Sequence, residues 1–212
     1  MRGAVKAGAE ALIKERDYLS ELDAKIGDGD HGLNMARGAQ SALEALDEQS
    51  GAFTPSGMMR VVGEAFMMNV GGSAGPLYGS GFIAGAKALD APDAALDAKT
   101  IGNFLHEFNA AVQKRGKAKL GDKTMLDVSI PLEKVFVDNA DMPLTELLKL
   151  GRETARNAVE YTKELEAKRG RASYLGARSV GHIDPGAASS AIIWREVSLY
   201  IEKNFLATAQ AE

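Results

Sequence analysis

Apolar residues recur every three to four positions along most of the chain, which is the spacing that one face of an amphipathic helix requires. No segment shows the strict alternation of apolar and polar residues that is typical of a half-buried strand. The pattern predicts about eight helices, over residues 3–22, 33–47, 54–70, 74–89, 100–113, 124–137, 143–167 and 185–205. These helices indicate an all-α bundle, and no low-complexity linker divides residues 1–212 into more than one domain.

Individual residues mark some ends of these helices. Thr54 followed by Pro55, and Asp184 followed by Pro185, each match an N-cap with proline as the first helical residue. The Ala-Pro-Asp sequence at 91–93 predicts a turn. The last helix is expected to bury four apolar residues on one face, Trp194, Val197, Ile201 and Phe205.

The composition excludes several classes of function. Hydrophobic residues make up 45% of the chain and charged residues 25%, as in ordinary globular domains. There is no cysteine, which excludes disulfides, zinc–thiolate sites and a cysteine nucleophile. The net charge of −4 argues against a nucleic-acid partner, and no apolar run is long enough to span a bilayer. The N-terminus lacks an apolar signal segment, so we expect a cytoplasmic protein that does not associate with a membrane.

The most unusual segment is 23–32, which combines three carboxylates, Asp23, Asp28 and Asp30, with three glycines. Converging carboxylates repel one another unless a positive charge lies between them, and hard cations such as Mg²⁺ or Ca²⁺ prefer oxygen ligands. The spacing does not fit an EF-hand, because Ala39 stands where a bidentate glutamate is needed. From these residues alone, a Mg²⁺ site and a solvated acidic turn are both open.

Three further loops carry residues that a plain bundle would not need. The glycine-rich turn at 71–76 precedes a helix, where backbone N–H groups favour a phosphate, although close helix packing also explains its glycines. The segment 115–125 offers basic side chains and Thr124, whose simplest role is to cap its helix. The segment 170–186 contains Arg171, which could bind a phosphate through two N–H groups. No Walker A sequence occurs, and no G-x-G-x-x-G follows a predicted strand.

Together, the four segments resemble the nucleotide-binding L subunit, or L domain, of dihydroxyacetone kinases. The matching motifs are Asp23-x-x-x-x-Asp28-x-Asp30-His31-Gly32-x-Asn34-Met35, Gly72-Ser73-Ala74-Gly75-Pro76-Leu77, Gly121-Asp122-Lys123-Thr124-Met125-x-Asp127, Gly170-Arg171-Ala172-Ser173-Tyr174-Leu175-Gly176 and His182-x-Asp184-Pro185-Gly186. The resemblance extends from about Leu22 to Ser190, and several motifs in the right order make it specific.

The resemblance implies a closed barrel of eight antiparallel helices with the nucleotide site in the loops at one end. It implies that Asp23, Asp28 and Asp30 bind two Mg²⁺ ions, which hold the phosphates of ADP or ATP. The positions that match the family's nucleotide contacts are His31, Gly32, Leu33, Asn34, Gly72, Ser73, Gly116, Met125, Arg171, Asp184, Pro185 and Gly186. Among these, Met125 is expected to pack against the adenine and Arg171 to offset phosphate charge.

The implied activity is phosphoryl transfer, assisted by the three aspartates and Arg171 without a protein nucleophile. Dihydroxyacetone, or a related short ketose, would be held by a separate K subunit. Bound ADP would be rephosphorylated by a phosphohistidine protein of the phosphotransferase system; alternatively, ATP would bind and leave as ADP. Two hypotheses of other classes stay open: a nucleotide-state sensor that docks on a transcription regulator, and an all-α scaffold whose acidic loop binds nothing.

Overall fold

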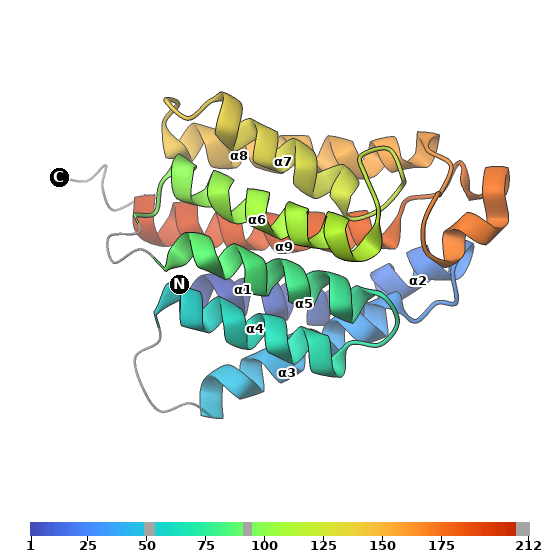
Figure 1. Ribbon diagram of the computed structural model, residues 1–212, viewed down its shortest axis with the longest axis horizontal. Coiled ribbons are helices and arrows are strands. Elements are labelled where there is room, and N and C mark those ends of the chain that lie inside the picture. Colours follow the sequence, from blue (N-terminus) through green and yellow to red (C-terminus); the bar gives the residue numbers. More distant parts are fainter. Residues whose placement is uncertain (49–53, 91–94, 207–212) are drawn as a thin grey trace.

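The computed structural model describes residues 1–48, 54–90 and 95–206 (Figure 1). Its α-helices are α1 (Arg2–Lys14), α2 (Arg16–Ile26), α3 (His31–Glu48), α4 (Pro55–Asn69), α5 (Ala74–Gly85), α6 (Ala98–Gly116), α7 (Leu126–Asp138), α8 (Leu144–Tyr161) and α9 (Pro185–Ile201). Shorter helical segments are η1 (Ala86–Leu89), η2 (Thr162–Glu164), η3 (Arg171–Ser179) and η4 (Glu202–Leu206). The described ranges contain no strand, which confirms the predicted all-α class. The turn predicted at 91–93 lies outside the described residues.

Eight of the α-helices pack in a ring in which each contacts the next. The order around the ring is α1, α3, α4, α5, α6, α7, α8 and α9, and α9 contacts α1 again. Successive helices run in alternating directions, so the α2–α3, α4–α5, α6–α7 and α8–α9 connections meet at one end, on the right of Figure 1. The N-terminus lies at the opposite end. No helix within the described ranges is both long and apolar enough to cross a membrane.

The first predicted helix, 3–22, is wrong in its extent, because the structure divides it into α1 and α2 at Glu15. Glu15 is a good helix former, so no local signal marks this break. α2, like α1, packs against α3 and α9, and it approaches α3 so closely that a Cβ atom at Gly32 would lie only 1.9 Å from the Arg16 carbonyl oxygen. α2 also continues to Ile26, which places Asp23 on a helix rather than in the loop.

Other helix ends also differ from the prediction. α6 extends to Gly116, and the helix predicted over 143–167 ends at Tyr161 and continues only as the short η2. The loop predicted before α9 contains the helical segment η3. The last helix changes to a π-helical turn at η4, which alters the number of residues per turn and leaves Phe205 45% exposed rather than buried. Trp194 and Ile201 are buried as predicted, whereas Val197 is half-buried.

Both predicted proline starts are confirmed. The Thr54 hydroxyl accepts a hydrogen bond from the Gly57 N–H at 3.0 Å, and α4 begins at Pro55. Asp184 caps α9 in the same way, and that helix begins at Pro185. In each case a side-chain oxygen satisfies an N–H group that the first helical turn leaves without a partner.

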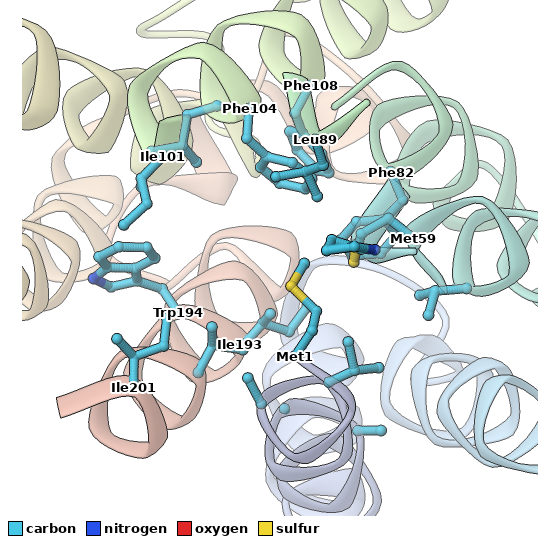
Figure 2. A pocket seen from close by; sticks show the side chains of 18 of the residues that line it. Met1, Met59, Phe82, Leu89, Ile101, Phe104, Phe108, Ile193, Trp194 and Ile201 are labelled. Carbon is cyan, nitrogen blue, oxygen red and sulfur yellow. The ribbon is translucent and has the colours of Figure 1, made fainter. Parts of the chain in front are cut away.

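The ring encloses an apolar interior that is rich in aromatic side chains. The rings of Tyr78, Phe82 and Phe108 have centroids 5.4–6.3 Å apart. A cavity of about 380 Å³ lies beside them, and Trp194 of α9 contributes to its wall (Figure 2). Burial of apolar surface stabilises such a core by about 25 cal/mol per Å². The core therefore holds the helices, and with them the loops at the ring's end.

α4 and α5 approach so closely that glycine is required at their contact. A Cβ atom at Gly63 would lie 2.8 Å from the Gly79 carbonyl oxygen, and one at Gly79 would lie 2.7 Å from that of Gly63. Backbone atoms cannot move aside as the end of a long side chain can. This pair therefore sets the spacing of the two helices and the position of the turn that joins them.

We expect Gly63→Ala to destabilise the protein by about 1–3 kcal/mol, because its methyl group would be forced against the backbone of α5. The matched control is Gly102→Ala on α6, where a Cβ would make no contact closer than 3.5 Å and where alanine has the better helix propensity. Urea unfolding followed by circular dichroism measures both. Equal stability of Gly63→Ala and the unmodified protein would contradict the close packing.

Candidate functional site

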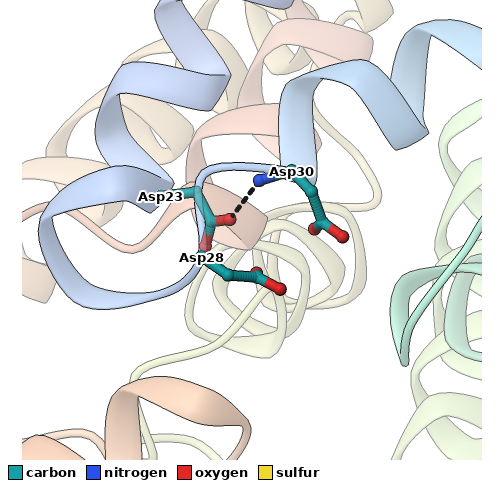
Figure 3. Close-up of side chains that lie close together, drawn as sticks. All are labelled: Asp23, Asp28 and Asp30. Carbon is teal, nitrogen blue, oxygen red and sulfur yellow. Dashed lines mark hydrogen bonds between the residues drawn. The ribbon is translucent and has the colours of Figure 1, made fainter.

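Three carboxylates converge where α2 passes into α3. Asp23 lies in the last turn of α2, and Asp28 and Asp30 lie in the loop that follows (Figure 3). One carboxylate oxygen of each residue lies within 4.8 Å of the other two. Like charges at this separation repel by roughly 1 kcal/mol per pair even in bulk water. A divalent cation would remove this repulsion, and a donor set made only of oxygens is the one that Mg²⁺ prefers.

Asp23 also shapes the loop that carries the other two aspartates. Its Oδ2 accepts hydrogen bonds from the backbone N–H groups of Asp30 at 3.0 Å and His31 at 3.2 Å. A Cβ atom at Gly27 would lie 2.2 Å from Asp23 Oδ1, and Gly29 has φ of +78°, which L side chains rarely adopt. The glycines thus allow a tight turn that Asp23 holds through its hydrogen bonds.

Arg171 brings a positive charge to this cluster from η3. Its Nη2 atom lies 2.9 Å from Asp28 Oδ2. Both side chains are exposed, so the ion pair contributes no more than about 1 kcal/mol to stability. The pair matters for its position, because it places a guanidinium group, which can bind phosphate through two N–H groups, beside the acidic cluster.

A hydrogen-bond chain connects the start of α3 to α9 and α5. His31 Nε2 lies 2.9 Å from the Ser189 hydroxyl, which lies 2.8 Å from the Tyr78 hydroxyl. Burial lowers the pKa of His31 and raises the pKa of Tyr78 to about 12, so both side chains are neutral near pH 7. The chain holds the first turn of α3, and therefore the end of the acidic loop, against the ring.

The glycine-rich turn between α4 and α5 lies beside the start of α3. A Cβ atom at Gly71 would lie 3.0 Å from the Asn34 side-chain oxygen. Gly72 has φ of +64°, and both Gly72 and Ser73 are exposed. Ser73 precedes α5 without a side-chain capping bond. The turn therefore presents backbone to solvent at a helix N-terminus, where the helix dipole favours an anion.

A pocket of about 420 Å³ opens next to this turn. It is lined by three of the predicted nucleotide-binding residues, Ser73, Gly116 and Met125, and by Arg169 and Gly170. The rest of its wall is formed by Pro76, Leu77, Val112, Arg115, Ala118 and Thr124. Met125 is buried, and the pocket wall combines apolar side chains with the basic Arg115 and Arg169. Such a pocket suits a planar base attached to a charged group.

The loop before α7 is held by a buried carboxylate. Asp127 accepts hydrogen bonds from the backbone N–H groups of Gly121 at 2.6 Å and Thr124 at 2.7 Å. Burial raises the pKa of Asp127, although these N–H groups favour its ionised form. The N-cap of α7 is Met125 rather than the expected Thr124, which lies one residue earlier and whose hydroxyl accepts from the Leu126 N–H at 3.2 Å.

Asp184 holds the start of α9 against the same pocket. Its carboxylate accepts a hydrogen bond from the Ala187 N–H at 2.7 Å, and burial raises its pKa to about 7. A Cβ atom at Gly186 would lie 3.4 Å from the Met125 backbone nitrogen. The start of α9 therefore lies close to Met125, which lines the pocket.

The structure brings the predicted residues to one end of the ring, although three of them have other roles or orientations. Leu33 is 49% exposed and is not among the residues that line the pocket. Gly32 packs against α2, and Pro185 is buried as the first residue of α9. Contact of each residue with a nucleotide stays a prediction.

Two residues with defined positions received no role from the sequence. Arg169 lines the pocket, and its Nε donates to Asp122 Oδ2 at 3.3 Å. Lys123 is 1% exposed, and its ammonium group donates to three backbone carbonyls. The sequence signal for a role of Lys123 was its place in the motif that begins at Gly121. Arg169 lies just before the motif that begins at Gly170, so the motifs did not indicate it.

A helical ring with an acidic loop, a glycine-rich turn and a pocket at one end defines the class of domain to which this chain belongs. The model of the DAK2 domain family matches residues 25–198. The chain therefore belongs to the DAK2 domain family.

Relatives and solved structures agree with this assignment. The chain is 41% identical over 186 residues to the ADP-binding subunit DhaL of the PTS-dependent dihydroxyacetone kinase of Lactococcus lactis, covering 87% of this chain and 88% of the relative. It is 38% identical over 185 residues to the ADP-binding subunit DhaL of a PEP-dependent dihydroxyacetone kinase of Listeria innocua, covering 87% of each. The crystal structure of the dihydroxyacetone kinase of C. freundii in complex with AMP-PNP and Mg²⁺ superimposes with a TM-score of 0.72 at 24% identity. That match covers 93% of this chain and 33% of the other, so it shows the fold.

The raised pKa of Asp184 predicts a pH-dependent stability in protein free of metal and nucleotide. The folded state binds the Asp184 proton more tightly than the unfolded state does. The contribution of this proton to the free energy of unfolding is therefore complete below about pH 4 and is lost as the pH rises through about 7. Asp184→Asn keeps a capping oxygen but cannot ionise. Its stability relative to the unmodified protein should therefore rise by up to about 2.5 kcal/mol between pH 5 and 8. Urea unfolding of both proteins across this range tests it, and a constant difference would show that the pKa is not raised.

Proposed function

We propose that this chain is the nucleotide-binding L-type subunit of a dihydroxyacetone kinase and carries Mg²⁺-ADP or Mg²⁺-ATP in phosphoryl transfer. The proposal rests on three carboxylates within 4.8 Å of one another at the end of the ring that also holds the pocket of Ser73, Gly116 and Met125. Relatives that are named ADP-binding subunits and are matched over most of their length support it. We further propose that residues 1–212 act as a single domain in the cytoplasm.

In this proposal each segment has a distinct task. Asp23, Asp28 and Asp30 would hold two Mg²⁺ ions, whose charge lets carboxylates and phosphates share one site. Backbone N–H groups of Gly72 and Ser73 would donate to phosphate oxygens. Met125 would pack against the base. The further proposed nucleotide contacts are His31, Gly32, Leu33, Asn34, Gly116, Arg171, Asp184, Pro185 and Gly186.

The chemistry asked of this chain is positioning and charge stabilisation, because phosphoryl transfer requires little covalent participation by the protein. The aspartates fix where the phosphates lie, and Arg171, already beside Asp28, would stabilise negative charge on the transferred group. No side chain of this site serves as a nucleophile in the proposal. The ketose, dihydroxyacetone or a close relative, would be held by a separate K subunit, so this chain would be active only with that partner.

We propose that bound ADP is rephosphorylated in place by a phosphohistidine protein of the phosphotransferase system. The names of the relatives, which are PTS- or PEP-dependent kinases, favour this donor over exchange of free ATP. A sensor that docks on a transcription regulator would need the same nucleotide site, so only an assay of transfer separates it from the catalytic subunit.

The first test is nucleotide content followed by reconstitution. Protein that has been desalted and then denatured should release near-stoichiometric ADP, measured by chromatography. Addition of a K subunit and a phosphohistidine donor should then phosphorylate dihydroxyacetone. If the protein instead contains no nucleotide and binds ATP reversibly, exchange of free ATP would replace rephosphorylation of bound ADP in the proposal. Retained nucleotide without transfer would favour the sensor, and a protein that binds no nucleotide would refute the proposed function.

The metal assignment predicts that Asp28→Asn and Asp30→Asn each weaken Mg²⁺-ADP binding by about tenfold or more, because each removes an anionic ligand. Their melting temperatures without metal should stay the same or rise, since one like charge is removed from the cluster. Asp23→Ala should also lower the melting temperature, because two backbone N–H groups lose their acceptor.

Isothermal titration calorimetry and thermal unfolding measure these effects. Asp138→Asn, at the far end of α7, is the matched control and should bind like the unmodified protein. Tight Mg²⁺-ADP binding by both loop variants would remove the aspartates from the metal site.

A further inference from the structure

Lys123 is a buried cation to which the proposed transfer assigns no task. It lies in the loop between α6 and α7 and is 1% exposed. Lysine is almost never buried to this extent unless its charge is satisfied, because an ammonium group loses strong hydration. Its contacts therefore require a structural or functional explanation.

The ammonium group donates to carbonyl oxygens on both arms of one long segment. Its Nζ lies 2.6 Å from the Thr162 oxygen, 3.1 Å from the Leu165 oxygen and 2.6 Å from the His182 oxygen. Thr162 and Leu165 lie where the chain leaves α8, and His182 lies where it returns to α9. An ammonium group has three donors, and here all three are used. Lys123 thus closes the base of the segment 162–184.

Neighbouring contacts strengthen the same closure. The backbone oxygen of Asp122 accepts from the Lys168 N–H at 3.0 Å, and its side chain accepts from Arg169 at 3.3 Å. The two arms also bond each other directly, since the Gly181 N–H donates to the Lys163 oxygen at 2.7 Å. The α6–α7 loop therefore holds the segment at its base through Lys123 and further along, at Lys168 and Arg169, through Asp122.

The backbone at Lys123 is itself in an unfavourable conformation. Its φ is +61°, a region that residues other than glycine rarely adopt. Such a conformation costs about 1–3 kcal/mol and persists only where the surroundings hold it. A glycine would relax the backbone, but it would leave three carbonyl groups without their donor. The three hydrogen bonds of the ammonium group therefore outweigh the cost of this backbone conformation.

The segment that Lys123 closes carries functional groups of the site. Arg171 extends from it to Asp28 at 2.9 Å, and Arg169 and Gly170 line the pocket. Asp184, at its end, caps α9. A shift at the base of the segment would move Arg171 away from the acidic cluster without changing the aspartates themselves.

We propose that Lys123 is a positioning residue, whose ammonium group holds the segment 162–184 so that Arg171 is presented to the acidic cluster. This inference rests on the proposed function, in which Arg171 meets the phosphates. Lys123 itself contacts neither nucleotide nor metal and acts through Arg171.

The test compares Lys123→Met and Lys123→Arg with the matched control Lys149→Met, an exposed lysine on α8. Mg²⁺-ADP affinity is measured by calorimetry, and Mn²⁺ affinity without nucleotide by electron paramagnetic resonance, both well below each variant's melting temperature. Lys123→Met should weaken Mg²⁺-ADP binding about tenfold, the scale of one charge-assisted contact. Its Mn²⁺ affinity should stay the same or increase, because Asp28 loses its partner. Lys123→Arg keeps the charge and should recover part of the affinity.

A double-mutant cycle with Arg171→Ala separates positioning from general destabilisation. If Lys123 acts through Arg171, Lys123→Met should weaken Mg²⁺-ADP binding much less in the Arg171→Ala background than in the unmodified one. The same factor in both backgrounds, or weaker Mn²⁺ binding by Lys123→Met, would overturn the inference. If Lys123→Met does not fold, Lys123→Arg is used in the same cycle. Its loss of Mg²⁺-ADP affinity in the unmodified background should be smaller, and an equal factor in both backgrounds would again overturn the inference.

Failure of the inference and failure of the proposed function give different results. If the unmodified protein binds no Mg²⁺-ADP, the proposed function fails for all variants together. If it binds Mg²⁺-ADP and the folded Lys123 variants bind equally well, only the role of Lys123 is refuted. Hydrogen exchange adds a readout that needs no ligand. The backbone amides of 165–182 should exchange faster in Lys123→Met than in the unmodified protein and at the same rate in Lys149→Met. Unchanged exchange rates in both variants would also refute the positioning role.

Discussion

The loop end of this molecule is organised around the mutual repulsion of Asp23, Asp28 and Asp30, which lie within 4.8 Å of one another. Dipoles or positive charge nearby lower the free energy of like charges held so close. Here two backbone N–H groups bond Asp23 and the Arg171 guanidinium pairs with Asp28. This partial compensation leaves a site to which a divalent cation is well suited, and the neighbouring glycines provide the room for the loop to turn.

The helical ring supplies the rigidity that such a loop lacks. Alternating helix directions place every second connection at the same end, so segments far apart in the chain become neighbours (Figure 1). Close contact of Gly63 and Gly79 sets the glycine-rich turn, and the His31–Ser189–Tyr78 chain ties the acidic loop to the interior. The scaffold is held by apolar burial, whereas its loops are held by individual polar contacts.

Those polar contacts follow one physical rule. Irregular loops leave backbone groups without the partners that a helix would give them, and a charged side chain can satisfy several at once. Lys123 does so for three carbonyl groups, and Asp127 does so for two N–H groups. Asp184 satisfies the first turn of α9. These three side chains bond backbone groups, which gives the loops a defined shape without regular secondary structure.

The sequence by itself determined the helical class, most helix positions and the four loop motifs, because apolar period, N-caps and glycine clusters are properties of neighbouring residues. Tertiary structure alone decided the break at Glu15, the exposure of Phe205 and the placement of Asp23 on a helix. It also decided that Arg171 meets Asp28 and that Lys123 joins two arms of a distant segment. These contacts join residues far apart in the chain, and they exist only once the ring of helices has closed and brought the loops together.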